Sequence, residues 1–341
     1  MNARTPAPMR ARWIFQRMLG LVVAGAASVA AAGCGPGFEP YNRLNSPRVL
    51  ALKSDPVRPA TGESTMLSAA TYTPNDVPLF YDWSWCPVAT PAGVACPLTD
   101  HDLVANGIPG SLHLTTDPAE PTATFTNDIP ADKLAAICAG TAGFPAPDCT
   151  DGYPIQLQLS ICTDSDPANC TDAAHAVQAV RPMLLRFRPN DQANANPAIT
   201  GISALIAGMD QPADLQATPS PTLTRHKETV IQVDVDTDTD AEMYMGKDDN
   251  DNPALVYERL TLTWFVESGN TNHLRTSFIH GTTASGDATR QVKWTPVFKK
   301  DEKDSLRTNT DVSKIIVVIR DDRDGVSWIQ GSAQLVEATT P

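Results

Sequence analysis

The sequence has few of the motifs that build catalytic or metal sites. Its 341 residues include six histidines, none of them in an H-E-x-x-H or H-x-H motif or beside a G-x-S-x-G nucleophile elbow. Neither a P-loop nor a G-x-G-x-x-G phosphate loop occurs, and no C-x-x-C indicates a zinc site. These absences exclude the common catalytic motifs. A hydrolase that uses carboxylates distant in sequence stays open as an alternative.

Positive charge and long apolar segments are scarce as well. The chain has 26 Lys and Arg against 39 Asp and Glu, a formal net charge of −13. Such acidity argues against binding of nucleic acid and against electrostatic docking on anionic lipid. Beyond residue 34 the longest aliphatic run is Ile315–Ile319, which has the length of a strand and is too short to span a membrane.

The first 34 residues have the pattern of an export signal. Four arginines, no acidic residue and the apolar run Met18–Gly33 lead to Ala31-Ala32-Gly33-Cys34. This ending resembles the lipobox of bacterial lipoproteins, in which small residues precede the cysteine that becomes the acylated N-terminus. The resemblance implies a signal peptide over 1–33 and lipid attachment at Cys34. The alternative is an ordinary secretory signal with a cleavage site at Ala30-Ala31-Ala32.

The expected anchor also predicts the location. Each buried methylene of an acyl chain contributes about 0.8 kcal/mol, so several palmitate-like chains on Cys34 hold a protein to the bilayer almost irreversibly. Gly35, rather than Asp, follows Cys34, which resembles the pattern of lipoproteins sorted to the outer membrane. We therefore expect a protein of the cell envelope, lipid-anchored in the outer membrane of a Gram-negative bacterium. Loss of the four arginines takes its formal charge from −13 to −17.

The cysteines predict disulfides. Seven cysteines leave six once Cys34 is set aside, and an even number in an exported protein indicates disulfide bonds. Six cysteines allow many pairings, but pairing of sequence neighbours is favoured because each neighbouring pair brackets a loop rich in Pro, Gly and Asp. The expected disulfides are Cys86–Cys96, Cys138–Cys149 and Cys162–Cys170.

After Asn45 the pattern becomes that of an all-β protein, with apolar residues at alternate positions and turn residues between the runs. In the first half the expected strands are Arg48–Lys53, Ser64–Thr73, Leu79–Cys86, Thr122–Thr126, Tyr153–Cys162 and Val177–Phe187. One short helix is expected at Ala131–Ala139, begun by a proline and ended by a glycine.

The second half repeats the pattern after a polar linker at 189–197. Its expected strands are Ala198–Ala207, Thr229–Asp236, Arg259–Glu267, Leu274–Ile279, Arg290–Val297, Lys314–Arg320 and Val326–Val336. Asp210–Glu228 is expected to be a mobile connection, and Asp321–Asp324 a polar hairpin tip before Gly325. The fold class is therefore all-β, with two tandem immunoglobulin-like β-sandwiches over 47–188 and 198–341. A lipidated tether over 34–46 precedes them.

Several segments of the chain are similar to a known family. They are the lipobox Cys34, the opening SPRVLALKSDPVRPATGES (Ser46–Ser64), the strand Tyr81–Cys86 and the closing hairpin Val317–Val326. In these segments the chain resembles a bacterial lipoprotein family with tandem immunoglobulin-like β-sandwich domains, which social, predatory Gram-negative bacteria carry in many copies. The resemblance covers most of the mature chain. It implies a location and a fold, and no activity carries over with it.

Two acidic runs could supply oxygen ligands to a hard cation such as Ca²⁺. The first, Asp234–Asp240, has carboxylates at alternate positions, which share one face of a strand, and the second is Asp248–Asn252. Neither is an EF-hand, since Ala241 and Lys247 stand where a loop starting at Asp236 needs Gly and Glu. A solvated strand edge is the favoured interpretation. The weak metal candidates are Asp234, Asp236, Asp238, Asp240 and Asp248, and no cofactor is expected.

No catalytic residue is expected. The leading interpretation is a non-enzymatic binding or scaffolding module whose partner is another envelope protein or a glycan. One alternative is a calcium-dependent adhesion or carbohydrate-binding module that uses the acidic runs, and the other is the hydrolase with dispersed carboxylates. A sugar-stacking platform could be built from five tryptophans, but three of them fall on apparent core faces, so packing is favoured: Trp83, Trp85, Trp264, Trp294 and Trp328.

Replacing Cys34 with Ala should abolish membrane retention and leave the folded domain intact, because the acylated cysteine is the expected anchor. Metabolic labelling with a fatty acid, followed by detergent phase partitioning, measures acylation and retention together. Equal membrane association of Cys34→Ala and the wild type would show that the anchor assignment is wrong.

Overall fold

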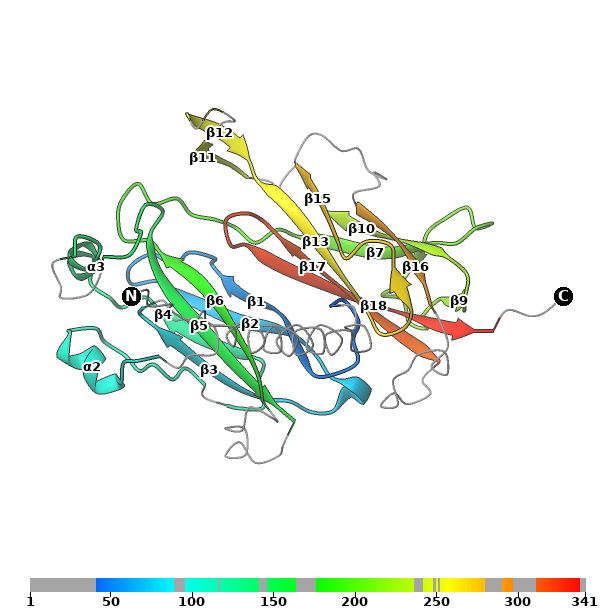
Figure 1. The fold of residues 1–341 in the computed structure, drawn as a ribbon, viewed down its shortest axis with the longest axis horizontal. Coiled ribbons are helices and arrows are strands. Elements are labelled where there is room, and N and C mark those ends of the chain that lie inside the picture. Colours follow the sequence, from blue (N-terminus) through cyan, green and yellow to red (C-terminus); the bar gives the residue numbers. More distant parts are fainter. Residues whose placement is uncertain are drawn as a thin grey trace, which may run out of the picture. The chain divides into compact units, whose positions relative to one another are not determined.

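The computed structural model describes residues 41–88, 96–115, 117–140, 146–163, 176–235, 242–247, 250, 252–279, 290–296 and 311–337. Asn42–Pro341 form one compact unit. In its described ranges this unit consists mainly of β-strands, with two short helices, α2 (Asp100–Ala105) and α3 (Ala131–Cys138), and a 3-10 turn, η1 (Pro74–Asp76) (Figure 1). The predicted all-β fold class is confirmed. None of the helices in the described ranges has the length and hydropathy needed to cross a membrane.

The first six strands form two three-stranded antiparallel sheets (Figure 1). Their orders are β1-β2-β4 and β3-β5-β6. The bounds are β1 Arg48–Asp55, β2 Ser64–Tyr72, β3 Phe80–Cys86, β4 Thr122–Thr126, β5 Tyr153–Cys162 and β6 Ala176–Leu185. All six strands were predicted, because each has a clear alternation of apolar and polar residues.

Because apolar and polar residues alternate along these strands, one face of each sheet packs in a shared core. On β5, the buried residues include Ile155, Leu157, Leu159 and Ile161. Trp83 on β3 is fully buried, and the Trp85 ring meets the Phe125 ring edge-on, with centroids 5.1 Å apart. Both tryptophans therefore pack in the core and are not available to stack on a sugar.

Two of the three predicted disulfides are confirmed. Cys86 is bonded to Cys96 and Cys138 to Cys149. Cys162 is disulfide-bonded too, but Cys170 lies outside the described residues, so the pairing of these two stays a prediction.

Helix α3 was predicted and α2 was not. Thr99 starts α2 with a capping box: Asp102 N donates to Thr99 Oγ1 at 3.3 Å, and Thr99 N donates to Asp102 Oδ2 at 2.7 Å. The helix has only six residues and buries a single large side chain, Leu103. So short a segment has no visible helical period, which is why the sequence pattern did not reveal it.

Strands β7–β18 build two five-stranded sheets and one two-stranded sheet. The sheet orders are β14-β16-β10-β7-β8, β15-β13-β17-β18-β9 and β11-β12. The bounds are β7 Ile199–Leu205, β8 Ala213–Asp214, β9 Thr222–Thr224, β10 Thr229–Val235, β11 Met243–Lys247, β12 Pro253–Tyr257, β13 Arg259–Val266, β14 Asn270–Thr271, β15 Arg275–Ile279, β16 Gln291–Thr295, β17 Val312–Arg320 and β18 Val326–Val336. The seven predicted strands are present.

The prediction of a mobile connection at Asp210–Glu228 is wrong. This segment contains β8 and β9, and β9 pairs in parallel with the end of β18. Its leucines, Leu215 and Leu223, are buried in the core of the second sandwich. These two anchors are eight residues apart among prolines and threonines, so they produce no strand period in the sequence.

A third apolar cluster, which we call the junction, lies between the two sandwiches. It is formed by Leu44, Leu50, Ala51, Ala70, Tyr72, Phe265, Ile316, Val318 and Val326, with Trp328 packed against them. Strand β17 is buried on both faces as a result. Val317 points into the core of the second sandwich and Val318 points into the junction, and neither is exposed to solvent.

Segments outside the sheets are also tied to the junction. Residues 42–45 belong to the segment expected to be a tether. Leu44 N donates a hydrogen bond to Val266 O, and Val266 N donates one to Asn42 O. In the segment expected to be a linker, Asn196 Nδ2 donates to Ser54 O at 2.8 Å and Asn196 Oδ1 accepts from Val326 N at 2.9 Å. Asn196 thus bonds to both sandwiches.

Replacing Val318 with Asp should loosen the two sandwiches from each other, because it puts a carboxylate without a cationic partner into the apolar junction. The expected loss of stability is about 3 kcal/mol or more. Limited proteolysis should then cut within 189–197 faster than it cuts the wild type. The matched control is Val312→Asp, at an exposed position of the same strand. Unchanged protection in Val318→Asp would contradict the junction's role in holding the sandwiches together.

Candidate functional site

The turn between β17 and β18, Asp321–Gly325, is called the junction hairpin below. Asp321 Oδ1 accepts hydrogen bonds from Arg323 N at 2.8 Å and from Gly325 N at 2.7 Å. Asp324 has a left-handed φ of 79°. Gly325 has no room for a side chain, since a Cβ there would clash with the Asp321 carboxylate and lie 2.7 Å from Ala195 O. The hairpin signal of the sequence is confirmed.

The interpretation of this turn as a polar tip needs a correction, because the rest of the chain encloses it. Arg323 is only 6% exposed. From the first sandwich, Arg58 Nη2 donates to Arg323 O at 3.1 Å and lies 3.6 Å from Asp324 Oδ2. Asn194 Nδ2 donates to Arg323 O at 3.0 Å and to Asp321 Oδ2 at 3.1 Å. The polar residues of the turn therefore face partners from distant parts of the sequence.

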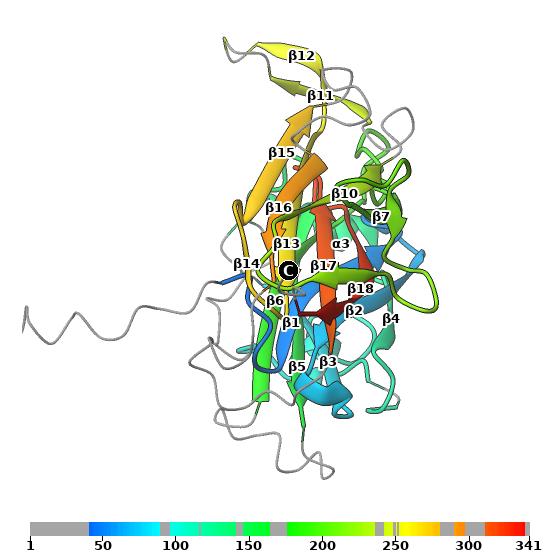
Figure 2. The same ribbon diagram turned by 90° about the vertical axis from the view of Figure 1, so that its right-hand side faces the viewer.

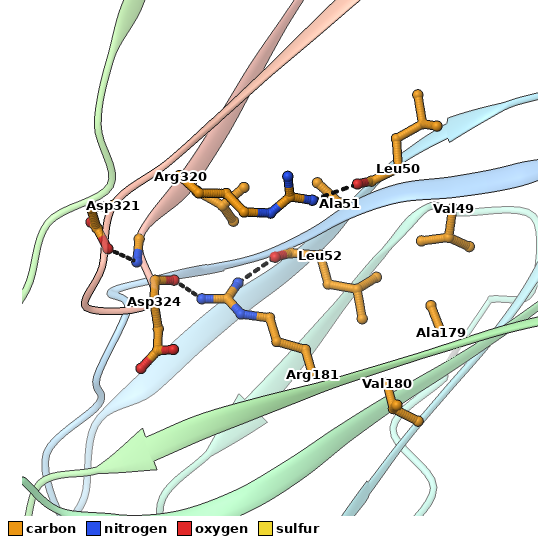
Figure 3. A pocket seen from close by; sticks show the side chains of 12 residues that line it. Val49, Leu50, Ala51, Leu52, Ala179, Val180, Arg181, Arg320, Asp321 and Asp324 are labelled. Atoms are coloured by element: carbon orange, nitrogen blue, oxygen red, sulfur yellow. Dashed lines mark hydrogen bonds between the residues drawn. The ribbon is translucent and has the colours of Figure 1, made fainter. Parts of the chain in front are cut away.

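Two arginines line a pocket of about 310 Å³ beside the junction hairpin (Figure 3). Arg181 on β6 donates to Leu52 O and Asp324 O, and Arg320 Nη2 donates to Leu50 O at 2.7 Å. Burial lowers the pKa of Arg181 to about 10, which leaves it charged at neutral pH. The carbonyls of Leu50 and Leu52 belong to the edge strand β1. The two guanidinium groups thus donate hydrogen bonds to the backbone carbonyls of this edge strand. These donors are used within the protein rather than by a ligand.

A second pocket, of about 280 Å³, lies at the other end of the junction near the start of β17. Lys314 Nζ forms an ion pair with the Asp76 carboxylate of η1. Glu267 accepts from Tyr72 OH at 2.8 Å and from Lys314 N at 2.7 Å. The junction therefore has an apolar centre and a polar rim at each end, as protein interfaces commonly do.

Strands β11 and β12, which we call the arm, are anchored on Arg323. Glu242 precedes the arm and Glu258 follows it, and Arg323 Nη1 lies 3.3 Å from Glu242 Oε2 and 2.9 Å from Glu258 Oε1. The Arg323 guanidinium also lies over the Tyr244 ring, 4.8 Å from its centroid. One buried cation thus contacts the residue before β11 and the residue after β12, where the arm joins the domain.

Glu258, where the arm joins the domain, has a strongly raised pKa. It is 1% exposed. Burial raises its pKa from 4.5 to about 7, the Asp321 carboxylate adds to the rise, and Arg323 opposes it. Glu242, which is closer to solvent, contributes a smaller repulsion. The carboxyl therefore takes up a proton near neutral pH.

The arm pairs with no other strand among the described residues and extends beyond the five-stranded sheets in both views (Figures 1 and 2). Met243 pairs with Tyr257 and Met245 with Leu255, so the four side chains share one face. Their exposed fractions are 56%, 45%, 53% and 66%, in that order. We call this the outer face of the arm.

The opposite face of the arm packs on itself and on the junction hairpin. Tyr244 pairs with Val256, and a Cβ at Gly246 would lie 2.5 Å from Val256 Cγ2 and 3.0 Å from Tyr244 Cε2. Tyr244 OH donates to Asp322 Oδ2 at 3.3 Å. One face of the arm is therefore fixed to the domain, while the outer face exposes four large apolar side chains together with Lys247.

The arm was not predicted from the sequence. Its signal was present as Met243-Tyr244-Met245 and Leu255-Val256-Tyr257 on either side of an Asp/Asn turn. Because both faces of these short runs carry apolar residues, the period-two pattern of a half-buried strand is lost. The acidic residues of the turn were instead interpreted as possible cation ligands or as a solvated strand edge.

The residues singled out from the sequence are only partly placed. Cys34, Asp236, Asp238, Asp240 and Asp248 lie outside the described residues. Asp234 is exposed on β10 and accepts from Gln232 Nε2 at 3.3 Å, while Ile231, Val233 and Val235 face the core as predicted. Within the ranges that the structure describes, no three His, Cys, Asp or Glu side chains are grouped to hold a metal. Trp264 and Trp294 are fully buried core residues.

One His–Asp pair was not foreseen. His113 Nδ1 lies 3.1 Å from Asp82 Oδ1, and both side chains are more than half exposed. Solvent screens such a pair, so its contribution is small. It adds no argument for catalysis.

Replacing Glu258 with Gln should remove a pH dependence of stability. The folded-state pKa is about 7 against an ordinary 4.5, so the protonated form stabilises the fold. That contribution, about 3 kcal/mol, is complete below pH 4.5 and is lost as pH rises through 7. The melting temperature of the wild type should therefore fall relative to Glu258→Gln between pH 5 and pH 8. Glu242→Gln is the partly exposed control. Parallel pH profiles for the wild type and Glu258→Gln would contradict the assignment.

Comparison with known proteins gives little information about the function of these sites. No protein-family model matches the chain, and no curated protein matches it. The N-terminal Ig1-2 module of the Drosophila receptor protein tyrosine phosphatase DLAR has 10% identity over 86% of this chain and 100% of its own, with a TM-score of 0.22. A carbohydrate-binding module of the β-sandwich superfamily has 10% identity, coverage of 85% and 100%, and a TM-score of 0.21. At such TM-scores these likenesses carry no argument about function.

Proposed function

We propose that the chain is a non-enzymatic binding module of the cell envelope, anchored through Cys34, which docks a partner protein on the outer face of the arm. The observation that carries the proposal is the exposure of Met243, Met245, Leu255 and Tyr257 on one face of a hairpin that pairs with no other described strand. Soluble proteins seldom leave large apolar side chains grouped in this way unless the patch has a partner.

Stability gives a second reason for a partner. A two-stranded hairpin is marginal in water by itself, and among the described residues it is the inner face of the arm that packs on the rest of the domain. Complete burial of an exposed Leu or Met side chain contributes about 1.5–3 kcal/mol. Covering the outer face would therefore stabilise both the arm and the complex.

The anchor is the other element of the proposal. Its support is the resemblance of Ala31-Ala32-Gly33-Cys34 to a lipobox. A lipid anchor keeps the module at the envelope, where a weak apolar docking surface meets its partner at high effective concentration.

A photo-crosslinking amino acid placed at Leu255 of the full-length lipoprotein, in its own cells, tests the docking surface. Irradiation should produce one or a few discrete heavier species, because a bound partner covers this position. The matched control is the same amino acid at Val104 on α2, which is 70% exposed and lies far from the arm in sequence.

The expected result is an adduct at position 255 that disappears when Met245 is also changed to Ser. Absence of any adduct at 255, or the same adducts from 255 and 104, would show that the arm is not a docking surface. A melting temperature within a few degrees of the wild type confirms that each variant is folded.

A further inference from the structure

One edge of the first sandwich, that of β4, is open among the described residues. Strand β4 (Thr122–Thr126) ends the sheet β1-β2-β4, and β2 is the one described strand that pairs with it. Figure 2 shows β4 beside β2 at the outer end of this sheet. We infer that an extended segment of another protein binds here by adding to β4 as a further strand. This site is separate from the arm and goes beyond the proposed function.

Alternate residues of β4 direct their backbone polar groups away from β2. Asn127, which follows β4, faces β2, because its N–H donates to Glu63 O at 3.0 Å. In an antiparallel pair the backbone groups of successive residues point alternately toward the partner strand and away from it. The N–H and C=O groups that point outward are therefore those of Thr122, Thr124 and Thr126.

Nothing in the described part of the chain forms a hydrogen bond with this row of outward backbone groups. Along a strand, groups two residues apart are separated by about 6.8 Å. The backbone of a second extended chain carries donors and acceptors at the same spacing, so it is the ligand that fits the whole row. Binding of this kind depends on main-chain hydrogen bonds, and the side chains add selectivity.

Two other edges of the first sandwich are covered, which sets β4 apart. The segment 112–118 covers the edge of β3, where Leu114 N donates to Trp83 O at 2.9 Å. Arg181 and Arg320 donate to carbonyls at the edge of β1. Proteins usually cover an edge, charge it or bend it with a bulge. Strand β4, with the sequence TATFT, has no charged residue and pairs with β2 in unbroken register, so it has none of these protections.

The side chains of β4 indicate the composition of the added strand. Its solvent face carries three threonines, and Met66 of β2, which is 54% exposed, lies opposite Thr124 on that face. Uncharged β-branched and aromatic side chains pair well with such neighbours in a sheet. Pro121 precedes β4 and the exposed Asp128 follows it closely, so the open edge accepts about five residues, or about 17 Å, of strand.

A second copy of this chain fits the edge less well. The antiparallel register that pairs all five residues of two β4 strands places Thr124 opposite Thr124 of the other copy. The same register places Glu120 opposite Asp128, and both of these carboxylates are exposed. Like charges directly opposite each other in a sheet are destabilising. The edge is therefore assigned to a different protein.

Hydrogen exchange in the purified full-length protein tests whether the edge is open. The amide of Thr124 should exchange at least about tenfold faster than the amides of Ala123 and Phe125, which bond to β2. Protection of Thr124 equal to that of Phe125 would show that the edge is covered, and it would overturn the inference.

A photo-crosslinking amino acid at Thr122 or at Thr126 of the full-length protein, in its own cells, tests the occupant. Both positions lie on one face of β4, at its two ends. An added strand should give adducts from both positions with one segment of one partner, at sites about four residues apart. The yield should fall by about tenfold or more in Thr124→Pro, which removes an outward N–H. In the matched control Thr124→Val, which keeps this N–H, the yield should change by less than about twofold.

Adducts with this spacing that are lost in Thr124→Pro and kept in Thr124→Val support the inference. No adduct, adducts on unrelated segments, or equal yields from the two variants would overturn it, and so would adducts with a second copy of this chain. If Thr124→Pro does not fold, the spacing of the adducts decides alone. Met245→Ser should leave the β4 adducts unchanged, so failure of this inference is distinguishable from failure of the arm as a docking surface.

Discussion

The attachment of the arm to the junction hairpin depends on the buried guanidinium of Arg323. Its side chain contacts the carboxylates of Glu242 and Glu258 at the two ends of the arm and lies over the Tyr244 ring. Its backbone carbonyl accepts from Arg58 of the first sandwich and from Asn194. Removing a cation from water costs several kcal/mol, and only a site with this many partners offsets that cost. The arm, the junction hairpin and the first sandwich therefore meet at one residue.

The junction supplies the apolar counterpart of this polar centre. Val318 and Ile316 on β17 pack against Leu50 and Ala70 of the first sandwich, while the polar contacts of Arg181 and Lys314 lie at the two ends. Apolar burial stabilises the contact without fixing its register, because it has no direction. The directional hydrogen bonds of the junction hairpin select one alignment of the sandwiches. The apolar junction thus supplies stability, and the hydrogen bonds of the junction hairpin supply the alignment.

Much of the fold could be predicted from the sequence, because a strand with one buried face leaves a period of two. Tyr153–Cys162 was predicted to the residue for this reason. A strand that is covered on both faces has no such period, and Lys314–Arg320 was predicted instead from its run of apolar residues. Ile315–Ile319 is a continuous apolar run, since its odd positions face the second core and its even positions face the junction. The arm was missed because both of its faces carry apolar residues. The hairpin at Asp321–Gly325 was predicted, but its burial was not, because its contacts join residues far apart in sequence and no local pattern records such a contact.

The arrangement at the base of the arm also bears on how the arm would bind. Association is weakened by the cost of ordering flexible groups, so a surface fixed in advance binds more tightly than a mobile one of equal area. Arg323 fixes both ends of the arm, and Tyr244 holds its inner face to Asp322. The base of the arm and its Tyr244 are thereby positioned before any partner binds. The methionines on its outer face keep their side-chain freedom, so adaptation to the partner is confined to the side chains that would touch it.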